Sequence, residues 1–379
     1  MRESRYHAAM RMTGFEVGLA CLASVTMVAA CGGGDDAATP DALEGAPDGA
    51  PGMDAPAVDA PLDGSTQPMT LADTGLCSDP GCLTINPGIS TYTPHYALWS
   101  DGATKQRWMA LPPGTQIDTS NMDLWKFPVG TKFWKAFTRD GIRVETRYMT
   151  KVLADDTAPG AWTYMTFAWN AAQDAATPVT MGVMNANGTQ HDIPSRGNCR
   201  ECHDSLAPSR ILGFGAIQLD LQGAAGDLDL DDLIAQNLLT VPPSAAATPG
   251  APHFPLPGND PAVHAALGYL HANCGHCHNP TSGYFGHTPL DLRLRTTQLG
   301  TVAETSAYRT TVGVMGLSYT DNGTAYPTII VPGMPDQSAL IVRMNSLVPE
   351  RRMPLRGSEV VDPAGQATIR AWIDQVTAP

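Results

Sequence analysis

The feature that most constrains this chain is a pair of short motifs, each with two cysteines separated by two residues and followed at once by histidine. The first is Cys199-Arg-Glu-Cys202-His203 and the second is Cys274-Gly-His-Cys277-His278. This spacing is that of covalent haem attachment, in which each thiol adds to one vinyl group and the histidine ligates the iron. The sequence therefore predicts two covalently bound haem c groups, with His203 and His278 as iron ligands.

Zinc is the alternative metal, because two Cys-x-x-Cys pairs can supply four thiolates to one tetrahedral site. The histidine after each pair favours haem, since a four-cysteine zinc site does not need it. The gap between the two pairs is also long for a single zinc site. We therefore expect haem.

Residues 1–30 have the pattern of an export signal. Basic residues precede an apolar run from 17 to 28, which is too short to remain as a membrane-spanning helix. The small residues before Cys31 resemble a bacterial lipoprotein signal, in which that cysteine becomes the lipid-bearing first residue. A plain secretory signal is the alternative, and both predict export. Gly32 favours the outer membrane by the sorting rules of enteric bacteria, so we expect a lipid-anchored protein facing the periplasm.

Residues 31–68 consist almost entirely of Gly, Ala, Asp and Pro, with eight acidic side chains and no lysine or arginine. Such a stretch cannot bury enough apolar surface to offset its chain entropy, so it predicts a disordered tether. These acids account for much of the formal net charge of −14. No basic patch indicates nucleic-acid binding.

Cysteine usage agrees with an exported protein. Of the eight cysteines, Cys21 lies in the signal, Cys31 is predicted to carry lipid and four would hold haem. The remaining pair, Cys77 and Cys82, flanks an Asp-Pro-Gly turn and can close a small disulfide. Buried free thiols are the alternative for this pair, because so short a loop stabilises little.

Residues 69–192 have the pattern of a β-rich domain. The stretches 131–137, 142–148 and 162–169 alternate apolar or aromatic with polar residues, and Asp140-Gly141 between the first two predicts a hairpin. There is enough material for a sandwich-like domain of ordinary size. The aromatic side chains are expected to pack in its core.

The composition then changes to helical patterns, so the fold class is α+β with more than one domain. Residues 193–258 form the first haem-binding segment and contain an expected helix at 229–239. In residues 259–379, Asp260-Pro261 predicts an N-cap followed by proline at the first helical position. Apolar residues then recur at helical spacing as far as Cys274.

A second capped helix is expected to begin after Asp362, and a shorter helix is expected at 335–344. The apolar stripe of the closing helix is Ile369, Trp372, Ile373 and Val376. A helix leading into the haem motif, a methionine loop and a closing helix with an aromatic residue is the order of a class I cytochrome c.

The candidates for the sixth ligand of the second iron, opposite His278, are Met315, Met334, Met344 and Met353. Met353 precedes a proline directly before the closing helix, as in the distal loop of small cytochromes c, whereas Met344 lies inside a helix pattern. We therefore predict Met353. A soft thioether favours ferrous iron and suits an electron carrier.

The sixth ligand of the first iron is less constrained. The candidates are Met181, Met184, His191, His264 and His271, or no residue at all. His191 precedes the first motif by a short link and could reach back over the ring, and His271 is the second choice. An open position would permit peroxide chemistry.

Several further motifs are spread along the chain. They are Trp99-Ser-Asp-Gly102, Arg107-Trp108, Leu111-Pro-Pro-Gly114, Phe127-Pro-Val-Gly-Thr131, Glu145-Thr-Arg147, Pro194-Ser195, Leu212-Gly-Phe214, Gln218-Leu219, Tyr269-Leu-His-Ala-Asn-Cys274 and Arg352-Met-Pro354 with Asp362, Ile369 and Trp372. With the two Cys-x-x-Cys-His motifs, they resemble a family of exported dihaem c-type cytochromes, and the resemblance covers nearly all of residues 71–376. Related segments are similar to cytochrome portions attached to quinoprotein sugar dehydrogenases. The resemblance implies electron transfer with periplasmic redox partners, among them a quinoprotein dehydrogenase.

The sequence thus favours a lipid-anchored electron carrier, or an electron-transfer subunit, over a stand-alone enzyme. One alternative is an enzyme similar to the dihaem peroxidases, with an open first haem. Another is a lipoprotein whose β-rich domain binds a ligand while the haems sense redox state.

Overall fold

The computed structural model describes residues 67–203, 211–282 and 288–377. The described residues all belong to one compact unit. The predicted signal, with Cys21 and Cys31, and nearly all of the predicted tether lie outside the described residues. Within the described ranges, no helix is both long and apolar enough to cross a membrane.

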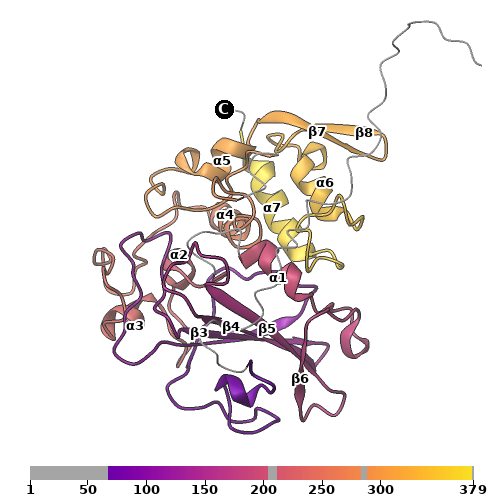
Figure 1. Ribbon diagram of the computed structural model, residues 1–379. Coiled ribbons are helices and arrows are strands. Elements are labelled where there is room, and N and C mark those ends of the chain that lie inside the picture. The colour runs from indigo at the N-terminus through magenta and orange to yellow at the C-terminus, as the bar shows by residue number, and fades with distance from the viewer. Residues whose placement is uncertain (1–66, 204–210, 283–287, 378–379) are drawn as a thin grey trace, which may run out of the picture. The chain divides into compact units, whose positions relative to one another are not determined.

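The described chain is an α+β protein, with an N-terminal six-stranded antiparallel sheet followed by a helical region (Figure 1). The six strands pair in chain order, and a separate two-stranded sheet lies in the helical region. The strands are β1 (Ser90–Thr91), β2 (Thr104–Ala110), β3 (Lys132–Arg139), β4 (Ile142–Lys151), β5 (Trp162–Trp169), β6 (Ala176–Val179), β7 (Met315–Asp321) and β8 (Thr324–Thr328).

The predicted hairpin is confirmed. Asp140 and Gly141 join β3 to β4, and Arg139 pairs with Ile142. Both turn residues have positive φ, 52° for Asp140 and 80° for Gly141. Two left-handed residues match the twist of the flanking strands, which explains the Asp-Gly pair at this turn.

Both faces of the six-stranded sheet are covered. One face bears Met109, Phe133, Met149 and Tyr164, and we call it the α1 face because α1 packs on it. Phe214, Leu219, Leu230 and Leu233 complete its core, whereas the other face carries Trp108, Trp134, Tyr148 and Phe167 under a segment that includes Leu71 and Leu76.

The predicted sandwich is therefore wrong for the described residues, which contain one large sheet here. Alternating apolar residues show which side chains of a strand are buried, but not what buries them. Helices and irregular segments from outside the sheet cover it in place of a second sheet.

The helical region is built around two packed helices. They are α4 (Pro261–Asn273) and α7 (Pro363–Gln375), and their predicted caps are confirmed. Asp260 accepts from the Ala262 N–H at 2.8 Å, and Asp362 accepts from the Gly365 N–H at 2.9 Å. The shorter helices are α1 (Arg196–His203), α2 (Ala216–Leu219), α3 (Leu230–Ala235), α5 (Ser306–Thr311) and α6 (Ala339–Asn345).

The apolar stripes expected for α4 and α7 form one core. Leu267 and Leu270 of α4 are buried together with Ile369, Trp372 and Ile373 of α7. Each helix therefore presents to the other the face that its sequence spacing predicted.

Two other helices are shorter than predicted. The helix expected at 335–344 is a 3-10 turn (Pro335–Gln337) and then α6, because Ser338 is extended with ψ 121°. The helix expected at 229–239 ends early, because Asn237 adopts a left-handed conformation with φ 55°.

One segment ties the sheet to the helical region. The Trp99 N–H donates to Asn273 Oδ1 at 2.7 Å, and the Trp99 indole donates to the Val360 carbonyl at 3.0 Å. Asn273 Nδ2 donates in turn to the Ala97 carbonyl, and Asp101 accepts from the Val360 N–H. The segment before β2 thus holds both the end of α4 and the loop that precedes α7.

Candidate functional site

The first Cys-x-x-Cys-His motif lies on α1, which contacts β5 of the sheet (Figure 1). Ser195 and Asn198 fix the start of this helix, because the Asn198 N–H donates to Ser195 Oγ at 3.3 Å and the Ser195 N–H donates to Asn198 Oδ1 at 3.2 Å. Cys199 packs against the core of the α1 face. The His203 and Tyr164 rings lie 5.6 Å apart, centroid to centroid. The sheet thus supports the first motif.

The second Cys-x-x-Cys-His motif begins where α4 ends. The Cys274 carbonyl accepts from the N–H groups of Cys277 and His278, at 3.1 and 2.8 Å, which forms a tight turn. Gly275 is suited to this turn because a Cβ there would lie 2.8 Å from a backbone oxygen of α4. The Leu292 N–H donates to the His278 carbonyl at 2.9 Å and anchors the end of the motif.

The two motifs meet, although they are far apart in the sequence. One ligand atom from each of Cys202, His276 and Cys277 lies within 4.8 Å of the other two. A hydrogen bond from the Cys277 thiol lowers the pKa of Cys202 well below its usual value and raises the pKa of Cys277. The sequence did not predict a role for His276, because a haem motif leaves the two residues between its cysteines free to vary.

Cys202, His276 and Cys277 are also a group that could hold a metal ion. Two thiols and one imidazole are donors that suit zinc. This set differs from the four-cysteine zinc site considered from the sequence, since Cys199 and Cys274 do not belong to it. Zinc bound here would be an alternative to covalent haem.

The second motif fits a covalently bound haem. Its cysteines, like those of the first motif, are free thiols. Burial lowers the pKa of His278 to about 4, so its ring is neutral at pH 7, which is the form that ligates iron. The His278 Nδ1 atom is buried and has no hydrogen-bond partner in the described part of the chain. The motif therefore offers neutral, unoxidised groups of the kind that haem attachment requires.

The candidate methionines for the second iron differ in burial. Met315 and Met334 are exposed, whereas Met344 is buried in the core of the helical region, as its helix pattern predicted. Met353 is half-buried, its N–H donates to the Arg343 carbonyl at 3.0 Å, and its bond to Pro354 is cis.

The loop that carries Met353 also contacts the first motif. Arg356 donates to both carboxylate oxygens of Glu201, at 2.9 and 3.0 Å, and Glu201 lies between the two cysteines of the first motif. In the same loop Arg352 pairs with Glu359. The methionine loop, the second motif and the first motif are thus neighbours in space.

The candidates for the first iron have other contacts. His191 is buried, with Nε2 at 2.7 Å from Glu145 Oε1 and its ring 5.3 Å from the Phe137 ring. His271 Nδ1 accepts from the Leu294 N–H at 3.1 Å, and His264 contacts backbone carbonyls near the start of α4. Met181 and Met184 are exposed.

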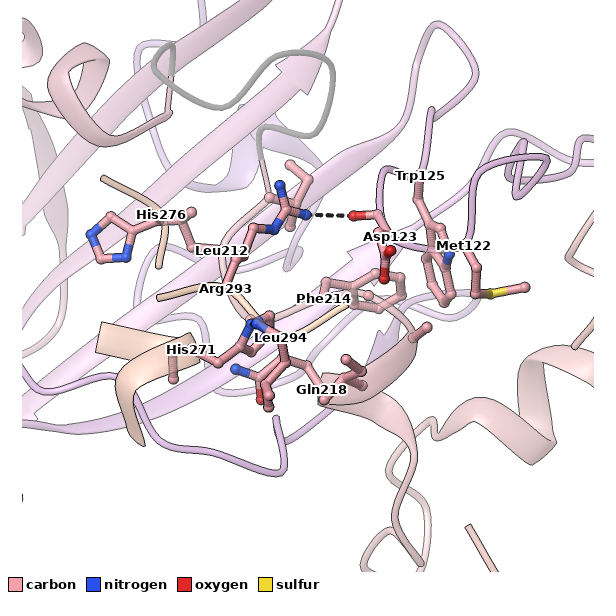
Figure 2. Close-up of a pocket in the computed structure, with 16 residues that line it drawn as sticks. Met122, Asp123, Trp125, Leu212, Phe214, Gln218, His271, His276, Arg293 and Leu294 are labelled. Atoms are coloured by element: carbon pink, nitrogen blue, oxygen red, sulfur yellow. Dashed lines mark hydrogen bonds between the residues drawn. The ribbon is translucent and has the colours of Figure 1, made fainter. Parts of the chain in front are cut away.

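Among the described residues, two cavities lie near this region. The smaller, of about 70 Å³, lies between the second motif and the loop before β3, where Arg293 donates to the Asp123 carbonyl (Figure 2). His271 and His276 also line it, and it is far too small for a haem. The larger, of about 970 Å³, is bordered by Lys105 and Tyr269 but by none of the motif cysteines.

Cys77 and Cys82 form a disulfide with Cα atoms 5.2 Å apart, remote from the motifs under the other face of the sheet. No family model, curated protein or solved structure matches this chain.

Proposed function

We propose that this protein is a dihaem c-type cytochrome that transfers electrons. Cys199 and Cys202 would hold the first haem and Cys274 and Cys277 the second, while His203 and His278 would ligate the irons. The single observation that carries the proposal is the meeting of the two motifs at Cys202 and Cys277. Two groups attached there would be close neighbours, and electron exchange needs that proximity.

The helical region would act as a class I-like cytochrome c unit. Helix α4 delivers Cys274 from its buried side, the loop before α7 presents Met353, and α7 closes the core. A thioether ligand would stabilise ferrous iron and raise the potential of the second haem. The protein's own contributions are thus a neutral His278, a thioether and an apolar core that excludes water.

The wider setting of the proposal comes from the sequence. Lipid attached to Cys31 would hold the protein at a bacterial membrane facing the periplasm, with the outer membrane favoured. Electrons would pass between periplasmic redox partners, one of which would be a quinoprotein dehydrogenase. The two motifs would then form a relay rather than a site of substrate turnover.

A dihaem peroxidase-like enzyme is the second candidate, and one observation favours it. His191, the first choice for the sixth ligand of the first iron, has its Nε2 atom on Glu145. The His191 Nδ1 atom is buried and has no hydrogen-bond partner among the described residues, so it would still be able to bind iron. The enzyme therefore requires that neither ring nitrogen of His191 reaches the first iron, which would leave that iron a position for peroxide. Low-spin iron at both haems supports the carrier, and high-spin iron at the first haem that reacts rapidly with peroxide supports the enzyme.

The test is the intact mass of the protein after acid–acetone extraction, which removes haem that is not covalently bound. We expect two retained haems in the unmutated protein, and one in a Cys199→Ala, Cys202→Ala double variant. The Cys77→Ala, Cys82→Ala double variant is the matched control and should retain both. A mass without haem would contradict the proposal, and so would stoichiometric zinc in metal analysis of the protein before acid treatment, because acid releases zinc.

A further inference from the structure

A row of basic side chains crosses the α1 face of the sheet. Arg107 on β2 lies directly opposite Lys135 on β3, which lies opposite Arg147 on β4. In the neighbouring row, Lys105 lies opposite Phe137. Like charges placed directly across adjacent strands destabilise a sheet, so this row needs an explanation.

Three of these cations converge on one aromatic ring. The Lys105 Nζ, Lys135 Nζ and Arg147 Cζ atoms lie 5.8, 5.1 and 4.3 Å from the centroid of Phe137. The electron-rich ring attracts each of them, but a single ring cannot offset the repulsion among several like charges. We call Arg107, Lys135 and Arg147, together with Lys105 of the neighbouring row, the basic row.

The basic row has too few anions for its charge. Glu145 is the carboxylate within it, and it already accepts from Arg147 Nε at 2.9 Å and contacts His191. Arg107 is only 6% exposed, and its buried Nε atom has no hydrogen-bond partner among the described residues. A buried guanidinium nitrogen without a hydrogen-bond partner is costly, and an anion over Arg107 and Lys135 would remove that cost.

Among the described residues, the two lysines of the basic row also lack a carboxylate partner of their own. Lys105 donates to the carbonyls of Leu98 and Ala103, at 2.7 and 3.0 Å, rather than to a carboxylate. Burial, reinforced by the neighbouring arginines, lowers the pKa of Lys105 to about 7 although Asp101 and Asp362 oppose the shift. The same causes, with Lys105 added, lower the pKa of Lys135 well below its usual value despite Glu145. A bound anion would restore both charges.

The position of the row relative to the first motif indicates which anion it is. Helix α1 packs on β5, and Arg147 on β4 is near enough to Cys199 and Cys202 that both cysteines help to raise its pKa. Adjacent strands are about 4.8 Å apart, so Lys135 and Arg107 lie roughly 5 and 10 Å beyond Arg147, away from α1. Haem has its vinyl groups and its two propionate carboxylates on opposite edges. A haem attached to α1 and extending across the sheet would bring its carboxylates toward this row.

We propose that Arg107 and Lys135, flanked by Lys105 and Arg147, bind the propionate carboxylates of the first haem. This inference rests on the proposed function, since it requires a haem on α1. It assigns the six-stranded sheet a part in cofactor binding, as the surface that orients the first haem and neutralises its acid groups. The positive charge would also stabilise the reduced, less positive iron.

The test is a spectroelectrochemical titration of the haem-loaded protein. The sulfur-to-iron absorption band follows only the second haem, so the remaining wave belongs to the first. Removing one positive charge about 10 Å from the iron, at an effective dielectric constant of about 20, should change the ratio of reduced to oxidised first haem on the order of tenfold. We therefore expect Lys135→Met and Arg107→Leu each to lower the first midpoint potential by about 59 mV, and to leave the second nearly unchanged.

Lys132→Met is the matched control. Lys132 is on the same strand but its side chain is on the opposite face, where it donates to the Thr74 carbonyl at 2.9 Å. It should leave both potentials unchanged, and Lys135→Arg should restore the first one. Should Lys135→Met and Arg107→Leu prevent folding, Lys135→Gln tests the same charge with a polar side chain of similar length.

The outcomes separate this inference from the function on which it rests. Two retained haems with an unchanged first potential in Lys135→Met, Lys135→Gln and Arg107→Leu would overturn the carboxylate assignment and leave the dihaem proposal standing. Absence of covalent haem would overturn both. The anion that occupies the basic row could be a free dicarboxylate instead of the haem propionates. Calorimetric titration with succinate tests for such a free ligand. Stoichiometric succinate binding to the haem-loaded protein, lost in Lys135→Met, would show that the row serves a free ligand instead.

Discussion

Replacing Asp101 with asparagine should stabilise this protein increasingly as the pH rises. Asp101 is 1% exposed, accepts from the Val360 N–H at 2.8 Å and shares a hydrogen bond with Glu359. Burial first, and the contact with Glu359 second, raise its pKa from 3.8 to about 7. An asparagine has the same shape, keeps an acceptor for Val360 and can donate to Glu359, without a charge to bury.

The size of the effect follows from the pKa shift. A carboxyl whose pKa is raised by folding stabilises the native state fully below its unfolded pKa, and that contribution is lost as the pH rises through the folded pKa. Between about pH 5 and about pH 7 the loss spans two pKa units, or about 2.7 kcal/mol at ~1.36 kcal/mol per unit. The positive charge of Arg352 offsets part of this loss of stability, and the Glu359 side chain is 30% exposed to water, which screens its charge. We therefore expect about half, ~1.4 kcal/mol.

Urea unfolding of both proteins at about pH 5 and about pH 8 measures this difference, since the free energy of unfolding is linear in urea. The free energy of unfolding of Asp101→Asn, relative to that of the unmutated protein, should increase by ~1.4 kcal/mol between the lower and the higher pH. Asp140→Asn, at a hairpin carboxylate that is 64% exposed, is the control and should show no such gain. If the stability difference for Asp101→Asn stays constant with pH, or reverses, the reasoning about this buried acid is wrong.

Three further predictions concern the core, the second haem and the anchor. Asp156→Ala should lower the free energy of unfolding, measured in urea, by about 3–5 kcal/mol, because Lys151 loses its buried partner. The Lys151 side chain is 2% exposed and its Nζ atom lies 2.8 Å from the Asp156 carboxylate. The Lys151→Met, Asp156→Leu double variant should recover most of the lost stability. Met353→Ala should abolish the sulfur-to-iron band and lower the second potential, and a surviving band would assign the ligand to another methionine. Cys31→Ser should move the protein out of the membrane fraction or leave it unprocessed, whereas unchanged, fully processed membrane association would remove the lipid anchor.

Local features of the fold were predictable because they depend on neighbours in the chain. The Asp140-Gly141 turn and the caps at Asp260 and Asp362 are set by backbone preferences and hydrogen bonds within a few residues. Predictions that relied on periodicity failed where one residue broke the pattern, as at Ser338 and Asn237. The sandwich failed because strand alternation does not specify the covering layer.

For the site, too, local features were predictable from the sequence and contacts between distant segments were not. Cysteine and histidine spacing within each motif is a local property, so the sequence by itself determined the haem candidates. Only tertiary structure decided that Cys202 meets Cys277 and that Arg356 reaches Glu201, because such contacts depend on how distant segments pack. The basic row was equally hidden, since Arg107, Lys135 and Arg147 become neighbours only through strand register. A one-residue slip in register would move a strand's side chains to the opposite face.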